Sequence, residues 1–360
     1  MRVVVASHGC FPFSTGGMER HTYNLAKWLA QSGLDVTVAL PESHRDERFP
    51  FPTAFFPWPR RPAWLWSNYD FSREVGQWID RTRPDIAFSQ GFALWAYGPR
   101  RKIPVVLHPH GLEMFGQGLR GKELPIAWMF RRVLASNARH ADRIVSLGGD
   151  LTRILRERVG VPESRLVEIP NAVDLSAFSA DSTVKTERSL LFVGRLVFNK
   201  GLDLLEDALA NLPDVPFQLT ILDDGPLRAR VEAFAKRDPR VRPVFGADEE
   251  TLRAAYASAE ALVFCSRFEG MPTVILEAMA QRCAILATSI GAVPVMFDKS
   301  AGIRCEPTSA SLATAIRAYF AKPFVERTAM GARGRKTVEA RFSWERVADE
   351  YLRLFRSLTP

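Results

Sequence analysis

The sequence predicts two doubly wound α/β domains, each built on a parallel sheet with helices on both faces. Three observations lead to this prediction. The chain has 360 residues, about 2.4 times the length of a typical single-core unit. Apolar runs of strand length recur in both halves, and stretches with helical apolar spacing separate them. The composition, 47% hydrophobic and 24% charged residues, is typical of a folded globular protein and not of a disordered chain.

The first half begins with a βαβ pattern. Arg2–Ala6 is a short, β-branched run suited to a strand that is buried on both faces. A polar loop with glycine and proline follows, and apolar spacing then predicts a helix over Met18–Ala30, with Gly33 as its C-cap. Asp35–Leu40 is the next predicted strand. Further strands are predicted at Asp85–Ser89, Val105–His108 and Arg143–Ser146.

The second half repeats the alternation of strands and helices. Strands are predicted at Ser189–Gly194, Gln218–Leu222, Arg242–Val244, Ala261–Cys265 and Ala284–Ala287, and helices at Gly201–Asn211, Leu227–Arg237, Glu249–Ala257 and Pro272–Gln281. We therefore predict a first domain over residues 1–172, a second over 173–342, and a closing helix within 343–360 that packs back on the first domain. In parallel α/β sheets a ligand is expected at the carboxyl ends of the strands.

Charge and cysteine content narrow the class of protein. The net charge is +8, and residues 1–180 carry 23 Lys and Arg against 17 Asp and Glu. A basic half suits nucleic acid, anionic lipid or a phosphorylated substrate, but no nucleic-acid-binding motif is present, which argues against nucleic acid. The four cysteines lack metal-ligand spacing. The N-terminus lacks the apolar region of a signal peptide, so we expect a cytosolic protein.

Two glycines, Gly16 and Gly17, lie between the first predicted strand and helix. Glycines at this point let the backbone approach a ligand closely, and the helix N-terminus offers free N–H groups to a phosphate. A plain tight turn explains the pair equally well. Neither a G-x-G-x-x-G dinucleotide fingerprint nor a G-x-x-x-x-G-K-[ST] loop is present, which argues against a nicotinamide dehydrogenase and a P-loop ATPase.

Two cations, Arg195 and Lys200, follow the first predicted strand of the second half. They would lie at the carboxyl end of that strand, where an α/β sheet binds its ligand. The planar guanidinium and the mobile ammonium together suit a diphosphate. The alternative is that both are solvated surface residues.

Two glutamates, Glu269 and Glu277, flank Pro272, which suits the first position of a helix. Glu277 would lie in an apolar helix, where a carboxylate needs a partner. Sugar or ribose hydroxyls are suitable donors to both carboxylates, and the first-turn N–H groups from Met271 to Thr273 could hold phosphate. A structural ion pair is the alternative for Glu277.

His110 follows the strand-like segment that ends at His108, which makes His110 a candidate pocket residue, although a lone histidine is more often structural. A metal site on these two histidines would need a third ligand, which the sequence does not indicate.

The adjacent Asp223 and Asp224 suggest either a metal-binding pair or, more simply, turn chemistry.

Taken together, these motifs resemble glycosyltransferase family 4, the retaining sugar transferases with the GT-B fold. The resemblance covers nearly the whole chain, and its most specific part is the glutamate segment. It rests on Gly16-Gly17, His110-Gly111, the segment Pro170 to Asp174, Gly194-Arg195 with Lys200-Gly201, Asp224-Gly225-Pro226, the segment Glu269 to Ala280, and Phe342 to Glu345.

The resemblance implies that the first domain binds the acceptor and the second binds a nucleotide sugar, across a cleft. It assigns four catalytic residues, His110 at the sugar, Arg195 and Lys200 at the departing diphosphate, and Glu269 at the sugar hydroxyls. It assigns nucleotide-sugar binding to Gly16, Gly17, Gly270, Met271, Pro272, Thr273 and Glu277. No metal or other cofactor is expected, because cations and helix N–H groups stabilise the leaving phosphate.

Residues 49–66 interleave aromatics with arginine and proline, which predicts an irregular loop, and residues 98–102 add a basic cluster. Tryptophan with arginine suits a membrane interface, so we expect peripheral attachment to the inner face of the cytoplasmic membrane. A folded lid is the alternative.

The predicted function is the transfer of a hexose-type sugar, from a UDP donor more readily than a GDP donor, to a glycan or lipid-linked acceptor in bacterial polysaccharide or lipopolysaccharide synthesis. A sugar-nucleotide epimerase of the same fold and a non-catalytic nucleotide-binding scaffold are the alternatives.

Overall fold

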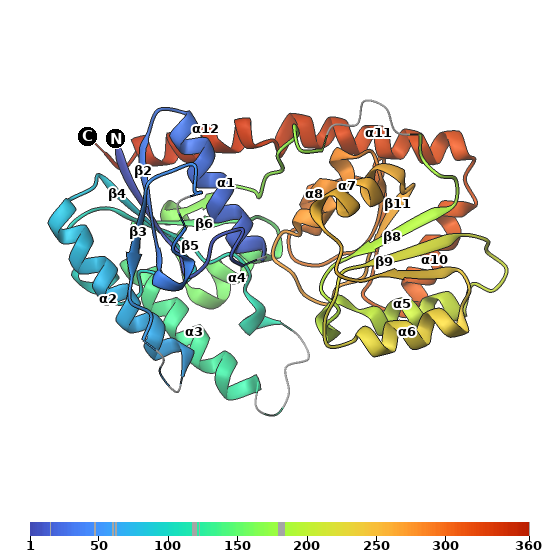
Figure 1. Cartoon of the computed structure of the whole chain (residues 1–360), viewed down its shortest axis with the longest axis horizontal. Helices are drawn as coiled ribbons and strands as arrows, with labels where there is room; N and C mark the ends of the chain where they lie inside the picture. The colour runs from blue at the N-terminus through green and yellow to red at the C-terminus, as the bar shows by residue number, and fades with distance from the viewer. Residues whose placement is uncertain are drawn as a thin grey trace. The chain divides into compact units, whose positions relative to one another are not determined.

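A computed structural model of the chain describes residues 1–360 except 15, 47, 60, 62, 117–120, 122, 179–183 and 360. Its internal contacts divide the chain into two units (Figure 1). The first comprises Met1–Asn171 together with Trp344–Pro360, and the second comprises Ala172–Ser343. Each unit contains one parallel sheet, as the sequence predicts for two doubly wound domains.

The first unit is built on a seven-stranded parallel sheet in the order β3-β2-β1-β4-β5-β6-β7. Its centre is apolar on both faces, as in β4, where every residue is buried. In register, Val3 of β1 lies opposite Val36 of β2 and Ile86 of β4. The strands are β1 (Arg2–Ala6), β2 (Asp35–Pro41), β3 (Thr53–Phe56), β4 (Ile86–Gln90), β5 (Val105–His108), β6 (Arg143–Ser146) and β7 (Leu166–Glu168).

Five α-helices cover this sheet, and the last of them comes from the end of the chain. They are α1 (Gly17–Gln31), α2 (Trp64–Thr82), α3 (Glu123–His140), α4 (Asp150–Ile154) and α12 (Trp344–Arg356). A π-helical turn, Leu155–Val159, extends α4. Helix α12 packs on α1, and the Tyr351 hydroxyl lies 3.1 Å from Nε2 of His21. Helix α12 therefore belongs to the first unit.

The second unit contains a six-stranded parallel sheet in the order β10-β9-β8-β11-β12-β13. Its strands are β8 (Ser189–Val193), β9 (Gln218–Leu222), β10 (Val241–Val244), β11 (Ala261–Phe264), β12 (Ala284–Thr288) and β13 (Gly302–Cys305). Its helices are α5 (Leu202–Ala210), α6 (Arg228–Arg237), α7 (Glu249–Ser258), α8 (Thr273–Ala280), α9 (Val293–Met296), α10 (Ser309–Phe320) and α11 (Phe324–Arg341). Pro243 lies in β10, an edge strand, where the missing N–H costs least.

Short 3-10 turns complete the two units. They are η1 (Glu42–His44), η2 (Gly98–Arg100), η3 (Glu113–Phe115), η5 (Glu163–Arg165) and η6 (Phe198–Lys200). Among the helices that the structure describes, none combines the length and the apolar character that a membrane crossing requires.

The prediction of an irregular loop over residues 49–66 is wrong for two parts of that segment. Thr53–Phe56 forms β3, and Trp64 begins α2. Phe51 and Phe56 are buried and serve the core of the first unit. The pattern failed because a four-residue edge strand flanked by prolines shows no alternation that sequence analysis can detect. Arg60 and Pro62, within the same segment, lie outside the described residues.

Residues 98–102 also differ from a free basic cluster. Gly98–Arg100 is a 3-10 turn, while Arg101 pairs with Asp142 at 2.9 Å and Lys102 with Asp80 at 3.0 Å. Two of the three cations are therefore neutralised by carboxylates of the same unit. Strands β7 and β13 and helices α2, α3, α4, α9, α10 and α11 were not predicted from the sequence.

Candidate functional site

The topology of each sheet creates one point where a ligand crevice is expected. In the first sheet the strand order reverses direction between β1 and β4, and in the second between β8 and β11. Neighbouring strands at such a point send their following loops to opposite sides, which leaves a crevice at the carboxyl ends. The predicted site residues follow β1 and β5 in the first unit, and β8 and β11 in the second.

In the second unit, the loops after β8 and β11 approach each other closely. Gly201 has a φ of +71°, and a Cβ atom there would lie 2.0 Å from the carbonyl oxygen of Cys265. Only glycine fits this position, because a side chain would meet both backbone strain and a carbonyl group. Asn199 Nδ2 donates a hydrogen bond to the carbonyl oxygen of Phe268 at 2.7 Å, and Arg267 N donates to that of Asn199 at 2.9 Å.

This close approach brings together two of the predicted catalytic residues. The ammonium of Lys200 forms an ion pair with Oε1 of Glu269, and the Ser266 hydroxyl donates to the same oxygen at 3.3 Å. The side chains of Lys200 and Glu269 are 24% and 18% exposed. This ion pair is partly buried but still reachable from solvent, and it lies at the carboxyl ends of β8 and β11, where the strand order reverses. The two side chains can therefore exchange their mutual contact for contacts to an anionic, hydroxylated ligand.

Arg195 lies on the same loop as Lys200 but is exposed. Among the residues that the structure describes, none forms a hydrogen bond or ion pair with its guanidinium. Its backbone is fixed by the adjacent Leu196, whose N–H donates to the carbonyl oxygen of Asp224 at 2.9 Å and whose carbonyl accepts from Leu227 N, also at 2.9 Å. The loop therefore presents a cation with its full hydrogen-bonding capacity unused.

Asp223 and Asp224 form the turn that fixes this loop. The Asp223 carboxylate accepts from Asp224 N, and that of Asp224 accepts from Gly225 N, both at 2.7 Å. Asp224 also pairs with Arg228 at 3.1 Å. These contacts support turn chemistry for the two aspartates. Within the described ranges, no group of three or more His, Cys, Asp or Glu side chains is arranged to hold a metal ion.

Glu277 lies on α8, where its carboxylate accepts a 2.8 Å hydrogen bond from the Tyr256 hydroxyl. Pro272 is the N-cap of α8 and not its first residue, so the helix begins at Thr273. Because Pro272 has no N–H, this turn has fewer donors for a phosphate than the sequence suggested. Gly270 and Met271 are buried, and Gly270 accepts a hydrogen bond from Ala292 N at 2.9 Å.

In the first unit, Gly16 is the N-cap of α1 and Gly17 its first residue. A Cβ atom at Gly17 would meet no heavy atom within 4 Å, so space around this backbone is open. At Gly16, however, a Cβ atom would lie 2.1 Å from a carboxylate oxygen of Glu19. This carboxylate occupies the N-terminal end of the helix and competes there with any bound phosphate.

His110 belongs to a buried cluster of polar rings at the carboxyl ends of β4 and β5. Its φ is +60°, and its backbone N–H donates to Nδ1 of His108 at 3.1 Å. Nε2 of His110 contacts Oε1 of Gln90, while Nε2 of Gln90 lies 3.1 Å from Nδ1 of His21. His21 in turn contacts Tyr351, so α1, β4, the loop after β5 and α12 all contribute to one network.

Burial keeps these histidines neutral. Desolvation lowers the pKa of His21 to about 3, and it also lowers the pKa values of His108 and His110 well below their ordinary range. Neighbouring histidines depress the last two further. Sequence analysis missed His21 and Gln90. Their only sequence signals were a polar residue at the end of a buried strand and a histidine one turn into the helix after Gly17.

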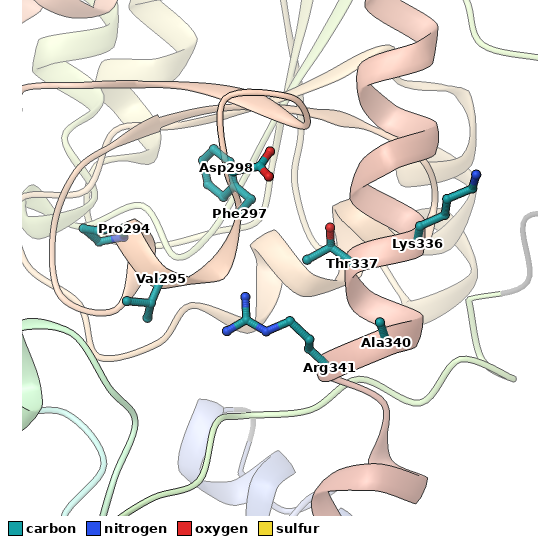
Figure 2. Close-up of a pocket in the computed structure, with 8 residues that line it drawn as sticks. All are labelled: Pro294, Val295, Phe297, Asp298, Lys336, Thr337, Ala340 and Arg341. Atoms are coloured by element: carbon teal, nitrogen blue, oxygen red, sulfur yellow. The ribbon is translucent and has the colours of Figure 1, made fainter.

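A separate cavity of about 620 Å³ lies in the second unit, between the α9 region and α11 (Figure 2). Figure 2 shows Lys336 and Arg341 extending from α11, and Asp298 on the segment after α9. The cavity is lined by Pro294, Val295, Phe297, Asp298, Lys336, Thr337, Ala340 and Arg341. None of the predicted site residues lines it.

Comparisons with known proteins match a glycosyltransferase family model to each half of the sequence. The family model described as Glycosyltransferase Family 4 matches residues 15–177, and the model described as Glycosyl transferases group 1 matches residues 177–337. A GDP-mannose:cellobiosyl-diphosphopolyprenol alpha-mannosyltransferase of Komagataeibacter xylinus is 26% identical over 379 residues, which cover 98% of this chain and 92% of that protein. TuaC of Bacillus subtilis, a glycosyltransferase assigned to teichuronic acid biosynthesis, is 28% identical over 252 residues, 67% of this chain and 61% of TuaC.

Solved structures show the same fold. Sucrose-phosphate synthase from Thermosynechococcus elongatus superposes with a TM-score of 0.83 at 20% identity, over 99% of this chain and 98% of that one. Anabaena HepE in complex with UDP-glucose superposes with a TM-score of 0.75 at 17% identity, over 99% of this chain and all of the other. The fold is GT-B, as predicted. With both family models matched in order along the sequence, the chain belongs to glycosyltransferase family 4.

Proposed function

We propose that this glycosyltransferase transfers a hexose-type sugar, with retention of configuration, from a nucleoside-diphosphate sugar to a glycan or lipid-linked acceptor. The observation that carries the proposal is the Lys200–Glu269 ion pair beside the unpaired Arg195, at the carboxyl ends of β8 and β11. Two cations suit a diphosphate, and a carboxylate suits sugar hydroxyls. A pocket for a nucleotide alone would not need Glu269.

The chemistry follows from these charges. The bond between the anomeric carbon and the β-phosphate oxygen breaks, and a bond from that carbon to the acceptor oxygen forms on the same face. The acceptor's proton passes to the departing phosphate, and the nucleoside diphosphate leaves. Arg195 and Lys200 stabilise the negative charge that grows on the diphosphate as it departs. Because two cations already balance this charge, the proposed reaction requires no metal.

The donor and acceptor classes rest on relatives. HepE is similar in fold and was solved with UDP-glucose, which supports a UDP donor, whereas the name of the Komagataeibacter relative specifies GDP-mannose. That name also specifies a diphosphopolyprenol acceptor, and the names of TuaC and of WaaG, a solved structure of similar fold, specify teichuronic acid and lipopolysaccharide biosynthesis, which supports a role in cell-surface polysaccharide or lipopolysaccharide synthesis. We assign a UDP donor ahead of GDP, and a site of action at the inner face of the cytoplasmic membrane.

The first test is a thermal shift measured with UDP, GDP, ADP and CMP, each with and without EDTA. A ligand present at 100 times its dissociation constant adds about 2.7 kcal/mol to the free energy of unfolding. We expect an EDTA-insensitive rise with UDP and not with CMP. A rise with GDP alone would correct the donor class, and the absence of a rise with every nucleotide would contradict the proposal.

A second test separates transfer from the alternatives. The nucleotide sugar selected by the thermal shift is incubated with a lipid-diphosphate-sugar acceptor, and the product is examined by NMR. We expect a new glycosidic bond with the donor's anomeric configuration. Conversion of the donor without an acceptor would indicate an epimerase. Nucleotide binding with no turnover on any acceptor would favour a scaffold.

A further inference from the structure

Large apolar side chains are exposed at the N-terminal ends of α2 and α3 in the first unit. Of the twelve large apolar side chains exposed among the described residues, six lie at these two helix ends. We call them the α2–α3 face, and they are Trp64, Trp66, Leu124, Ile126, Trp128 and Met129. Trp66 is 61% exposed and Trp128 58%. A cluster of this kind on a folded unit marks an interaction surface more often than scattered single residues do.

The two helix ends form one surface. The ring of Trp64 in α2 lies 6.1 Å from that of Phe130 in α3, and Figure 1 shows the two helices next to each other. Leu124 and Trp128 are four residues apart on α3, so they lie on the same side of the helix. Ile126 and Met129 lie on the other side of the helix, the side on which Val133 is buried further along. The first two turns of α3 are thus apolar and exposed on both sides, and the helix enters the core only further along.

The α2–α3 face has a positive charge beside its apolar side chains. The guanidinium of Arg132 stacks on Trp128, 5.0 Å from its ring centroid, and Arg132 is exposed one turn further along α3. The described residues 123–132 of α3 contain two Arg against one Glu, and the other Arg, Arg131, donates to the carbonyl oxygen of Met114 at 2.7 Å. Tryptophan and other apolar side chains next to arginine are typical of segments that lie in the interface of an anionic bilayer.

We propose that the α2–α3 face docks onto an anionic lipid surface, with Trp66 and Trp128 entering the headgroup region. The inference rests on the proposed function, which requires access to a lipid-linked acceptor. From the predicted membrane segment 49–66 it keeps only Trp64 and Trp66 at the start of α2, it adds α3, and it omits residues 98–102. A second copy of this chain is a less suitable occupant, because a symmetric contact would bring the arginines of both copies together.

Co-sedimentation with vesicles tests the inference. We expect the wild-type protein to bind vesicles of phosphatidylcholine with phosphatidylglycerol more tightly than vesicles of phosphatidylcholine alone, and to release at high salt. Trp66→Ser with Trp128→Ser should weaken binding by at least about tenfold. Arg132→Gln should weaken it about fivefold. Val325→Ser and Arg242→Gln are controls, because both residues are exposed in the second unit, and their binding should equal that of the wild type.

Tryptophan fluorescence supplies a local readout. Lipids with brominated acyl chains should quench the emission of the wild-type protein. The conservative Trp66→Phe and Trp128→Phe double variant should still bind these vesicles but lose most of the quenching. Unchanged quenching in this variant, or unchanged binding in the serine variant, would overturn the assignment, as would failure of the wild type to bind anionic vesicles.

Two further measurements identify the reason for a failure. Light scattering on a sizing column reports the oligomeric state, and a dimer that Trp128→Ser dissociates would show that a second copy covers this face and would refute the lipid assignment. The nucleotide thermal shift of the serine double variant should match that of the wild type. A nucleotide response without vesicle binding contradicts this inference alone, whereas vesicle binding without a nucleotide response contradicts the proposed function.

Discussion

Replacing Lys200 with methionine should affect stability and turnover by different amounts, which makes it the most informative single substitution. The ammonium is paired with Glu269 and is about one quarter exposed. Two unit charges about 4 Å apart interact by roughly 4 kcal/mol at an effective dielectric constant of 20. Partial exposure and the cost of desolvation reduce the net value, so we expect Lys200→Met to lower the free energy of unfolding by about 1–2 kcal/mol.

The effect on turnover should be larger. If Lys200 stabilises the departing diphosphate, the loss of about 2.7 kcal/mol of transition-state stabilisation slows turnover roughly 100-fold. Turnover is measured as release of nucleoside diphosphate from the donor that the thermal shift selects, and stability by urea unfolding. Lys236→Met is the matched control, because Lys236 is exposed on α6 of the same unit, and both of its values should stay at the wild-type level.

A double variant separates catalysis from simple pairing. In Lys200→Met with Glu269→Gln neither charge is left without its partner, so the free energy of unfolding should recover most of the loss seen in Lys200→Met. Turnover should remain at least as low as in the single variant. Near-normal turnover in folded Lys200→Met, or recovered turnover in the double variant, would refute the role of Lys200 at the diphosphate.

Three other substitutions and one removal give further tests. Arg195→Ala should leave the urea midpoint unchanged, because the guanidinium is exposed, yet reduce turnover by at least about tenfold; a lowered midpoint would contradict the free-cation description. Gly201→Ala should lower the free energy of unfolding by at least about 2 kcal/mol, because residue 201 has a positive φ and the new Cβ would clash with the carbonyl of Cys265. Gly246→Ala is the control in the same urea titration and should cost about 1 kcal/mol, because residue 246 also has a positive φ but open space at its Cβ. Burial lowers the pKa of His21 to about 3, so below about pH 6.5 the unfolded state binds more protons than the folded state. The free energy of unfolding should therefore fall by about 1.4 kcal/mol per pH unit from this group as pH decreases. His21→Gln should remove that part of the slope, and an unchanged slope would show that His21 is solvated. EDTA should leave turnover with the selected donor unchanged, and a loss restored by Mg²⁺ would show that the cations alone do not balance the diphosphate.

The sequence predicted the centres of both sheets because their physics is local. Strands such as β1 and β8 are buried on both faces and appear as continuous apolar runs. Glycines in the loops after these strands stand where a positive φ or a close backbone contact excludes a side chain, as at Gly201. The Lys200–Glu269 pair was predicted as two separate residues, and only the adjacency of β8 and β11 joins them, since 69 residues separate them along the chain.

Helix α3 was not predicted because it exposes apolar side chains as well as burying others, which weakens the contrast between its two sides. The aromatic residues of the segment 49–66 divide between two environments, Phe51 and Phe56 in the core and Trp66 in solvent. Residue type alone does not tell which apolar or aromatic side chains of α3 and of segment 49–66 are buried and which are exposed. The contact of His21 with Tyr351 spans 330 positions and depends on the docking of α12.

The two units differ in the charge that they bring to the proposed reaction, and this difference restricts the mechanism. In the first unit, burial lowers the pKa of His110 well below its ordinary range, so its imidazole is neutral near pH 7 and accepts protons poorly. Its Nε2 donates to the side-chain amide oxygen of Gln90, so only Nδ1 retains a lone pair. His110 is therefore suited to a hydrogen-bonding role and not to removing the acceptor's proton. In the proposed mechanism the base is then the departing diphosphate, whose charge Arg195 and Lys200 would stabilise, as a same-face reaction with retention requires.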